Sequence, residues 1–456
     1  MRQVIDKFSQ RLGPLWWHTL LMFVSSKMGD VINMYIALFV VPDVLDHEDL
    51  GAVVPIVRLV AVLSVPLSII LSTSLKYLSL FHVQGASGRV KALVLDLSKF
   101  ISVLSTLILL FLIVFRDFIE VRLKISDEKI LWVVAAMALM SCWKPTVEMA
   151  AQGTKRFYAL ILSQFFGPVV RLLAILAFLD SLQLAGYLLA TVLADLSICA
   201  LLVWSFYVCI KPTIVRESYS EFFPSIRKYL LPIGLVVLLT SIQTMIEPWI
   251  IRQRLSEADS AGFYMATTLG SIPMYFSNAM IPFFFVLISE NYERGLSTRK
   301  LHLQALGVVL VLGLSVSGVF LVFHQEILGL RPSWSTFSEY GPYVGLLGII
   351  MTGDILLRCH YLHENACHRF RYLWYYTFFI VLEVSLLYGL NLWTHVQDFF
   401  ANSTWLWVQE NMVSSLKFTV YFMLLTRVLI AFGIAIELIF FRFDGVRPSV
   451  SEASVR

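Results

Sequence analysis

Long apolar runs separated by short polar segments fill almost the whole chain. Most runs hold about 20 residues or more, the length that an α-helix needs to cross the hydrocarbon core of a bilayer. The pattern therefore predicts an all-α integral membrane protein with about twelve transmembrane helices. The predicted spans are residues 17–41, 51–81, 91–115, 130–151, 157–179, 182–209, 229–251, 261–289, 301–323, 341–363, 371–392 and 413–441.

The basic residues between the spans predict how the chain is oriented. If the N-terminus is cytoplasmic, the cytoplasmic segments hold 19 Lys and Arg residues and the external loops hold 7. Cytoplasmic loops of membrane proteins carry such an excess of positive charge. Adding or removing one helix would scramble the alternation beyond that point. We therefore predict twelve spans with both termini in the cytoplasm.

Composition supports a membrane class and argues against several others. Hydrophobic residues make up 58% of the chain and charged residues 14%, against about a quarter charged in soluble domains. The net charge of +4 is scattered over short loops, so no nucleic-acid partner is expected. The loops leave no room for a soluble catalytic domain, and no GxxxxGK[ST] nucleotide loop occurs. The chain is not expected to be an enzyme.

Two sequence matches at similar offsets suggest an internal repeat. The segment VLDHEDLGAV after the first span aligns with LSEADSAGFY after the seventh, so that Gly51 meets Gly262 at an offset of 211. Arg156 meets Arg369 at an offset of 213. Such repeats are common in transporters. They predict two six-helix halves of the same orientation, residues 1–210 and 211–456.

These motifs carry a resemblance to a known family. HEDLGAV, its echo EADSAGFY, TMIEPWIIRQRL, QGTKRFYALILSQ and RKYLLPIG resemble the polysaccharide transporters, or O-antigen-type flippases, of the multidrug/oligosaccharidyl-lipid/polysaccharide (MOP) superfamily. The resemblance implies a MATE-like V of two bundles in the cell inner (plasma) membrane. It also implies translocation of a polyprenyl-diphosphate-linked oligosaccharide for cell-surface polysaccharide, such as the O-antigen of lipopolysaccharide.

The same resemblance implies the partners and points to candidate site residues. Expected partners are the lipid-linked oligosaccharide, membrane lipids, and a polysaccharide polymerase with glycosyltransferases. No cofactor or metal is expected beyond a coupling ion, H⁺ or Na⁺. A diphosphate needs positive charge, and Arg offers it a bidentate fork. The candidate substrate-binding residues are Lys27, Asp30, Arg58, Arg171 and Glu247.

Each candidate also has a structural reading. Lys27 and Asp30 lie three residues apart on one helical face and can form a closed ion pair. Arg58 can reach the outer headgroups. Charged residues three or four apart elsewhere are expected to pair within their own helices and fix packing. These pairs are Asp96 with Lys99, Lys144 with Glu148, and Asp354 with Arg358.

The segment CHYLHENACH, residues 359–368, looks like a set of metal ligands. On a helix, His360, His363, Glu364 and Cys367 would form one stripe. The spacing matches no standard zinc motif, and polar residues are normal at a helix end near the cytoplasm. We therefore do not predict a metal site there.

Two other functions remain open at this stage. A multidrug/cation antiporter would share the fold, but it would need a compact acidic site and fewer cations in the cavity. A membrane polymerase of lipid-linked sugars would need a large external catalytic loop, which the chain lacks. The mixed charge of the first two spans favours an anionic, sugar-bearing substrate.

Overall fold

The computed structural model describes residues 21–125, 127–218, 223–278, 284, 288, 291–292, 296–367, 372–397 and 416–440. Within these residues the secondary structure is helical and contains no strand. Eight of the helices are long and apolar enough to cross a membrane. The chain divides into two compact units, Met1–Gln253 and Arg254–Arg456.

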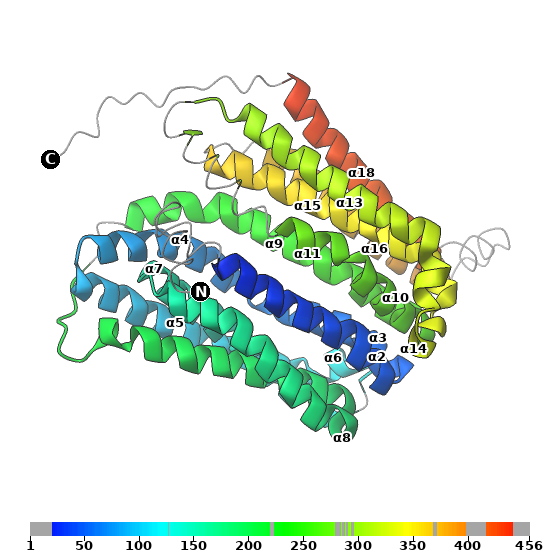
Figure 1. Ribbon diagram of the computed structural model, residues 1–456, viewed down its shortest axis with the longest axis horizontal. Coiled ribbons are helices and arrows are strands. Elements are labelled where there is room, and N and C mark those ends of the chain that lie inside the picture. The colour runs from blue at the N-terminus through cyan, green and yellow to red at the C-terminus, as the bar shows by residue number, and fades with distance from the viewer. Residues whose placement is uncertain are drawn as a thin grey trace, which may run out of the picture. The chain divides into compact units, whose positions relative to one another are not determined.

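The first unit runs from blue to green in Figure 1. Its first helix spans Leu21–Val44 and ends in the π-helical turn η1 (Ile36–Val40) and α2 (Val41–Val44). The remaining elements are α3 (His47–Leu63), α4 (Val65–Val83), α5 (Ser87–Val114), α6 (Arg116–Leu123), α7 (Glu128–Gly153), α8 (Phe157–Phe206), η2 (Tyr207–Ile210) and α9 (Phe223–Arg254).

The second unit is built around a pair of long helices, α13 and α15. Its described elements are α10 (Glu257–Gly270), α11 (Ile272–Asn278), α13 (Arg299–Leu328), α14 (Pro332–Ser335), η4 (Ser338–Tyr340), α15 (Gly341–Ala366), α16 (Tyr372–Gln397) and α18 (Leu416–Phe440). Helix α15 packs against α10, α13 and α18. Small residues let α13 and α15 approach closely, because a Cβ atom on Gly348 would lie 2.6 Å from the Ser317 hydroxyl.

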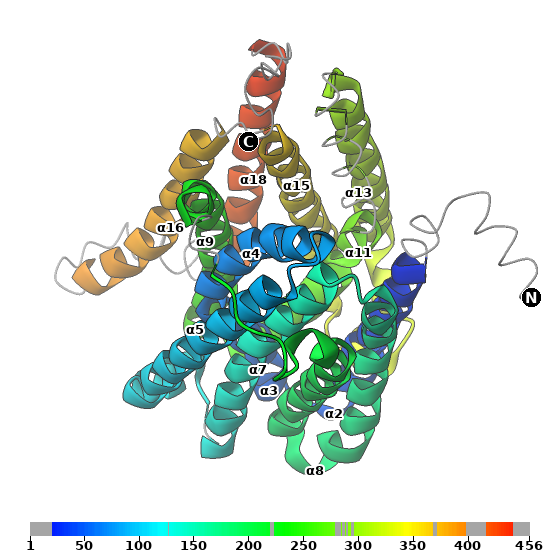
Figure 2. The ribbon, with the colours of Figure 1, turned by 90° about the vertical axis from the view of Figure 1, so that its left-hand side faces the viewer.

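Helix α8 contains two predicted spans joined by a sharp break. Gln183 has φ 49° and ψ −129°, which is not helical, and the chain reverses there. Figure 2 shows the two arms of α8 lying side by side. A Cβ atom on Gly167 in the first arm would meet the Ile198 side chain in the second at 2.3 Å. The arms therefore form a tightly packed helical hairpin.

The second and eighth spans were predicted as single helices, and the structure corrects this. Helix α3 ends at Leu63 and α4 begins at Val65, with a proline in its first turn. Helix α10 ends at Gly270 and α11 begins at Ile272, followed by Pro273. Because proline has no amide hydrogen to donate, it fits the start of a new helix better than a helix interior.

The repeat seen in the sequence has a local structural echo. The Asp46 side chain accepts a hydrogen bond from the Asp49 amide at the start of α3. The Ser256 hydroxyl accepts one from the Asp259 amide at the start of α10. Both are N-caps that stabilise the first turn of a helix.

The contact-based division and the predicted repeat boundary fall at different places. Helix α9 belongs by its contacts to the first unit, where the buried Arg252 donates through Nε to the Leu123 carbonyl, 3.0 Å away. The repeat assigns the same helix to the second half. The division into residues 1–210 and 211–456 stays a prediction.

Candidate functional site

A polar stripe runs along the first helix of the chain. Lys27 and Asp30 form an ion pair, with side chains that are 27% and 32% exposed. Asn33 lies one turn further on the same face. The closed Lys27–Asp30 pair is the structural reading that the spacing allowed. The proposed role of both residues in binding a substrate stays a prediction.

Arg171, on the first arm of α8, is held by two neutral groups, one of which is Asn33 in this stripe. Its Nη1 donates to Asn33 Oδ1 at 2.9 Å, and its guanidinium lies 5.0 Å from the centre of the Tyr187 ring on the second arm. Its Nε is buried without a hydrogen-bond partner. No carboxylate among the described residues forms an ion pair with Arg171. Its positive charge is therefore held in place, and none of the described carboxylates neutralises it.

Arg58 lies half-buried on α3 and forms no hydrogen bond or ion pair with the described residues. Glu247 lies on α9 and is 5% exposed, one turn after the buried Gln243. Glu247 has further interactions with other groups of the protein. That Lys27 and Arg58 serve one substrate path, and that Glu247 lines it, remain predictions.

Two of the expected same-helix ion pairs are wrong, because each acid or base finds a partner on another element. Lys144 on α7 pairs with Asp195 on α8, with 2.7 Å between Nζ and Oδ1, and not with Glu148. Asp96 on α5 pairs with Arg216, in the segment after η2, and not with Lys99. Inter-helix pairs tie neighbouring helices together, which same-helix pairs cannot do.

The second unit contains a buried arginine between two carboxylates. Arg427 on α18 donates through Nε to Asp354 on α15 at 2.8 Å, and through Nη1 to Glu383 on α16 at 2.6 Å. The Arg427 and Glu383 side chains are 3% and 0% exposed. From spacing within one helix, the sequence predicted Arg358 as the partner of Asp354. Arg427 lies on another helix, so that spacing could not identify it.

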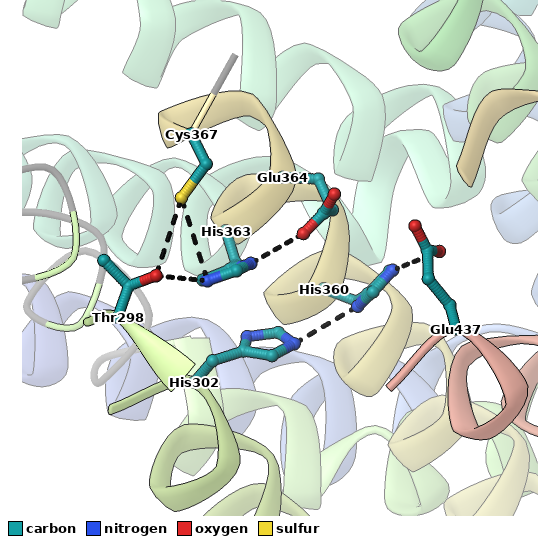
Figure 3. Close-up of polar contacts among 7 residues, drawn as sticks. All are labelled: Thr298, His302, His360, His363, Glu364, Cys367 and Glu437. Atoms are coloured by element: carbon teal, nitrogen blue, oxygen red, sulfur yellow. Dashed lines mark hydrogen bonds and ion pairs between the residues drawn. The ribbon is translucent and has the colours of Figure 1, made fainter. Parts of the chain in front are cut away.

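The stripe His360, His363, Glu364 and Cys367 does form on α15 and in the turn after it. It joins residues that the sequence pattern had not connected to it, namely Thr298 and His302 at the start of α13 and Glu437 near the end of α18 (Figure 3). No group of three or more His, Cys, Asp or Glu side chains among the described residues is arranged to hold a metal ion. The cluster is a network of hydrogen bonds.

Comparisons with known proteins identify the fold. No family model and no curated protein matches the sequence. Solved structures do match. One is an inward-facing multidrug resistance MATE family transporter of the MOP superfamily, with TM-score 0.67, 13% identity, and coverage of 91% of this chain and 97% of that one. The chain has the MATE fold.

Two further structures support the same assignment. An outward-facing multidrug resistance MATE transporter matches with TM-score 0.60 and 14% identity over 91% of this chain and 93% of that one. A MOP superfamily transporter from Pyrococcus furiosus, described by the reverse polarity of its binding pocket, matches with TM-score 0.62 and 13% identity over 92% and 94%. The predicted all-helical membrane fold of MATE type is confirmed, and the protein is a multi-pass membrane protein. The cytoplasmic position of both termini stays a prediction.

Proposed function

We propose that this protein is a membrane transporter that flips a polyprenyl-diphosphate-linked oligosaccharide across the inner membrane for surface polysaccharide synthesis. The observation that carries the proposal is the pair of arginines in the first unit, Arg58 and Arg171. Neither forms an ion pair with a carboxylate among the described residues. A polysaccharide polymerase and glycosyltransferases would be the partners that supply and consume such a substrate.

The physical argument rests on the cost of charge inside a bilayer. A positive side chain within a transmembrane segment costs about 2.5–3.5 kcal/mol on insertion scales, and such residues usually serve a partner or a pathway. Arg171 is held by an amide oxygen and an aromatic ring, which orient the guanidinium without cancelling its charge. A diphosphate would supply the missing anion and accept bidentate hydrogen bonds.

A multidrug/cation antiporter is the second candidate, and two acidic clusters favour it. Lys144 lies between Asp195 and the nearby Glu148, and Arg427 lies between Asp354 and Glu383. Each cluster holds one more carboxylate than cation. The fold does not decide between the two candidates, since the structures that share it include multidrug transporters and one described by a pocket of reverse polarity.

Reconstituted transport distinguishes the two candidates. The full chain is placed in proteoliposomes with either a fluorescent polyprenyl-diphosphate oligosaccharide or a cationic dye. We expect the lipid-linked sugar to become inaccessible to an external quencher faster than in protein-free liposomes, while the dye distribution stays unchanged. Dye movement in exchange for an ion, with no movement of the lipid-linked sugar, would favour the antiporter and overturn the proposal.

A further inference from the structure

A buried histidine cluster lies where three helices of the second unit meet. It joins the first turns of α13, the last two turns of α15 and the end of α18 (Figure 3). His302, His360 and His363 are 0% exposed, Glu364 is 1% exposed and Glu437 is 5% exposed. The proposed function makes no use of this cluster, which lies in a different unit from Arg58 and Arg171.

One arm of the cluster is a relay of two imidazoles and a carboxylate. His302 Nε2 lies 3.2 Å from His360 Nδ1, and His360 Nε2 lies 3.1 Å from Glu437 Oε2. Each short contact needs one proton between its two heavy atoms. Moving a proton along one contact therefore changes which nitrogen must donate in the next. The three groups form a chain in which protonation is shared.

The second arm is centred on His363. Its Nδ1 lies 2.9 Å from Glu364 Oε1, and its Nε2 lies 3.0 Å from the Thr298 hydroxyl and 3.8 Å from Cys367 Sγ. The His302 ring stacks on the His363 ring with 4.0 Å between centroids. Two imidazolium charges at that separation would repel strongly in a medium of low dielectric. The two arms are thus electrostatically coupled through His302.

The helix ends bias where positive charge can reside. His360 and His363 lie at the C-terminal end of α15, where the helix dipole favours a cation. His302 lies at the N-terminal end of α13, where the dipole disfavours one. A proton that enters the cluster is therefore stabilised on the two imidazoles that already contact carboxylates.

Other titratable and charged groups face the cluster from the packed elements. On α16, the Tyr375 hydroxyl is buried without a hydrogen-bond partner among the described residues, and the Tyr372 ring stands edge-on to His360. On α15, Arg358 is exposed, and its positive charge lies near the side chains of Tyr361 and Cys359. On α13, Arg299 and Lys300 are exposed. Among the described residues named here, Arg358, Arg299 and Lys300 are exposed, while the two carboxylates of the cluster contact imidazoles.

We propose that this cluster is a proton-binding site for two protons. With three neutral imidazoles and two carboxylates it carries a charge of −2, which is costly in a buried apolar setting. Two protons taken from water convert it into two neutral imidazolium–carboxylate pairs, His360 with Glu437 and His363 with Glu364. Histidine titrates near physiological pH. Proton exchange therefore changes the net charge of the side chains through which α13, α15 and α18 contact one another.

Solid-state NMR of the full chain in lipid bilayers reads this protonation directly. The imidazole rings are labelled with ¹⁵N and followed from pH 5 to 9, with His302→Gln, His360→Gln and His363→Gln used for assignment. We expect His360 and His363 to titrate as a coupled pair, while His302 stays neutral. Groups that interact by about one pK unit or more titrate as a set and not singly. Glu437→Gln, which keeps the side-chain shape, should therefore shift the midpoints of His360 and His363 by about one pH unit.

The exposed His47, on α3 of the first unit, provides the matched control. His47→Gln should leave the midpoints of His360 and His363 unchanged. The proposal is overturned if both of these rings keep one protonation state from pH 5 to 9, or if Glu437→Gln leaves both midpoints in place. Neither readout needs a transported substrate, so failure of the flippase proposal would not affect it.

Discussion

At the scale of single residues, several charged side chains in the described part of the chain pair with a residue on another element. The spacing of Lys144 and Glu148 predicted a contact within one helix, yet Lys144 reaches Asp195 on another. Spacing reports which residues share a helical face, but it holds no information on which other helix that face meets. The polar residues of each span could therefore be found in the sequence, whereas their partners needed the fold.

The Arg427 cluster gives a sharp prediction about stability. Glu383→Gln removes one of the two carboxylates that contact the buried guanidinium and should destabilise the protein by about 1.5–3 kcal/mol, because a hydrogen bond between charged groups is lost. The measurement is chemical or thermal unfolding of the purified protein in detergent.

A surface pair offers the control for that experiment. Glu120→Gln disrupts the Arg116–Glu120 pair, whose side chains are 37% and 22% exposed, and should cost less than about 1 kcal/mol. Equal effects of Glu383→Gln and Glu120→Gln would contradict the assigned burial.

At the scale of elements, glycine positions record how closely helices approach. A Cβ atom on Gly262 of α10 would lie 2.4–2.6 Å from the Tyr340 ring, whereas one on Gly307 of α13 would meet nothing within 4 Å. Gly262→Ala should destabilise the protein by about 1–3 kcal/mol through overpacking. Gly307→Ala should be neutral or stabilise by up to about 1 kcal/mol. Unfolding midpoints in detergent compare the two, and a loss of stability in Gly307→Ala alone would refute the packing.

The break between the two arms of α8 forms a hydrogen bond with a side chain of α3. The amide of Leu184, just after Gln183, donates to Asp49 Oδ2 at 3.2 Å from the first turn of α3. Burial raises the pKa of Asp49 despite this hydrogen bond. A raised pKa in the folded state means that ionisation of Asp49 opposes folding, so its stability contribution is lost as pH rises through the folded pKa.

A pH prediction follows for this residue. Asp49→Asn keeps an oxygen acceptor for Leu184 and removes the buried negative charge. The variant should therefore gain stability relative to wild type at neutral pH, and the difference should disappear in acid, where Asp49 is protonated in both states. Thermal midpoints measured from about pH 2 to 8 test this. A variant that is less stable than wild type throughout would show that the carboxylate charge itself supports the break.

Most helices could be predicted from sequence, as could the break within α8, whereas the breaks at Ser64 and Ser271 could not. Hydropathy reports burial or lipid contact along the chain, so the spans of α5, α7, α13 and α15 follow from it. It is insensitive to backbone geometry, so the interruptions at Ser64 and Ser271 escaped it even though a proline follows each one. Proline is common in transmembrane helices, and only packing decides which one ends a helix.

At the scale of the whole molecule, the charge bias of 19 to 7 between loops sets the predicted orientation. A reporter enzyme fused after Arg447 should be active in the cytoplasm, and one inserted near Asn402 should report an external position. Paired alkaline phosphatase and fluorescent protein fusions make the measurement. If the fusion after Arg447 is external and the one near Asn402 is cytoplasmic, the predicted orientation is reversed, and with it the direction of transport.

The most direct test of the central claim is the flipping rate of Arg171 variants in proteoliposomes. Arg171→Gln removes a charge-assisted contact worth about 1.5–3 kcal/mol, so flipping of the diphosphate-linked sugar should slow about 10- to 100-fold. Arg171→Lys should lose less, because it keeps the charge but not the fork. Arg122→Gln, at an exposed position of α6, should flip at the wild-type rate. A wild-type rate in properly folded Arg171→Gln would contradict the claim that this arginine receives the anionic substrate.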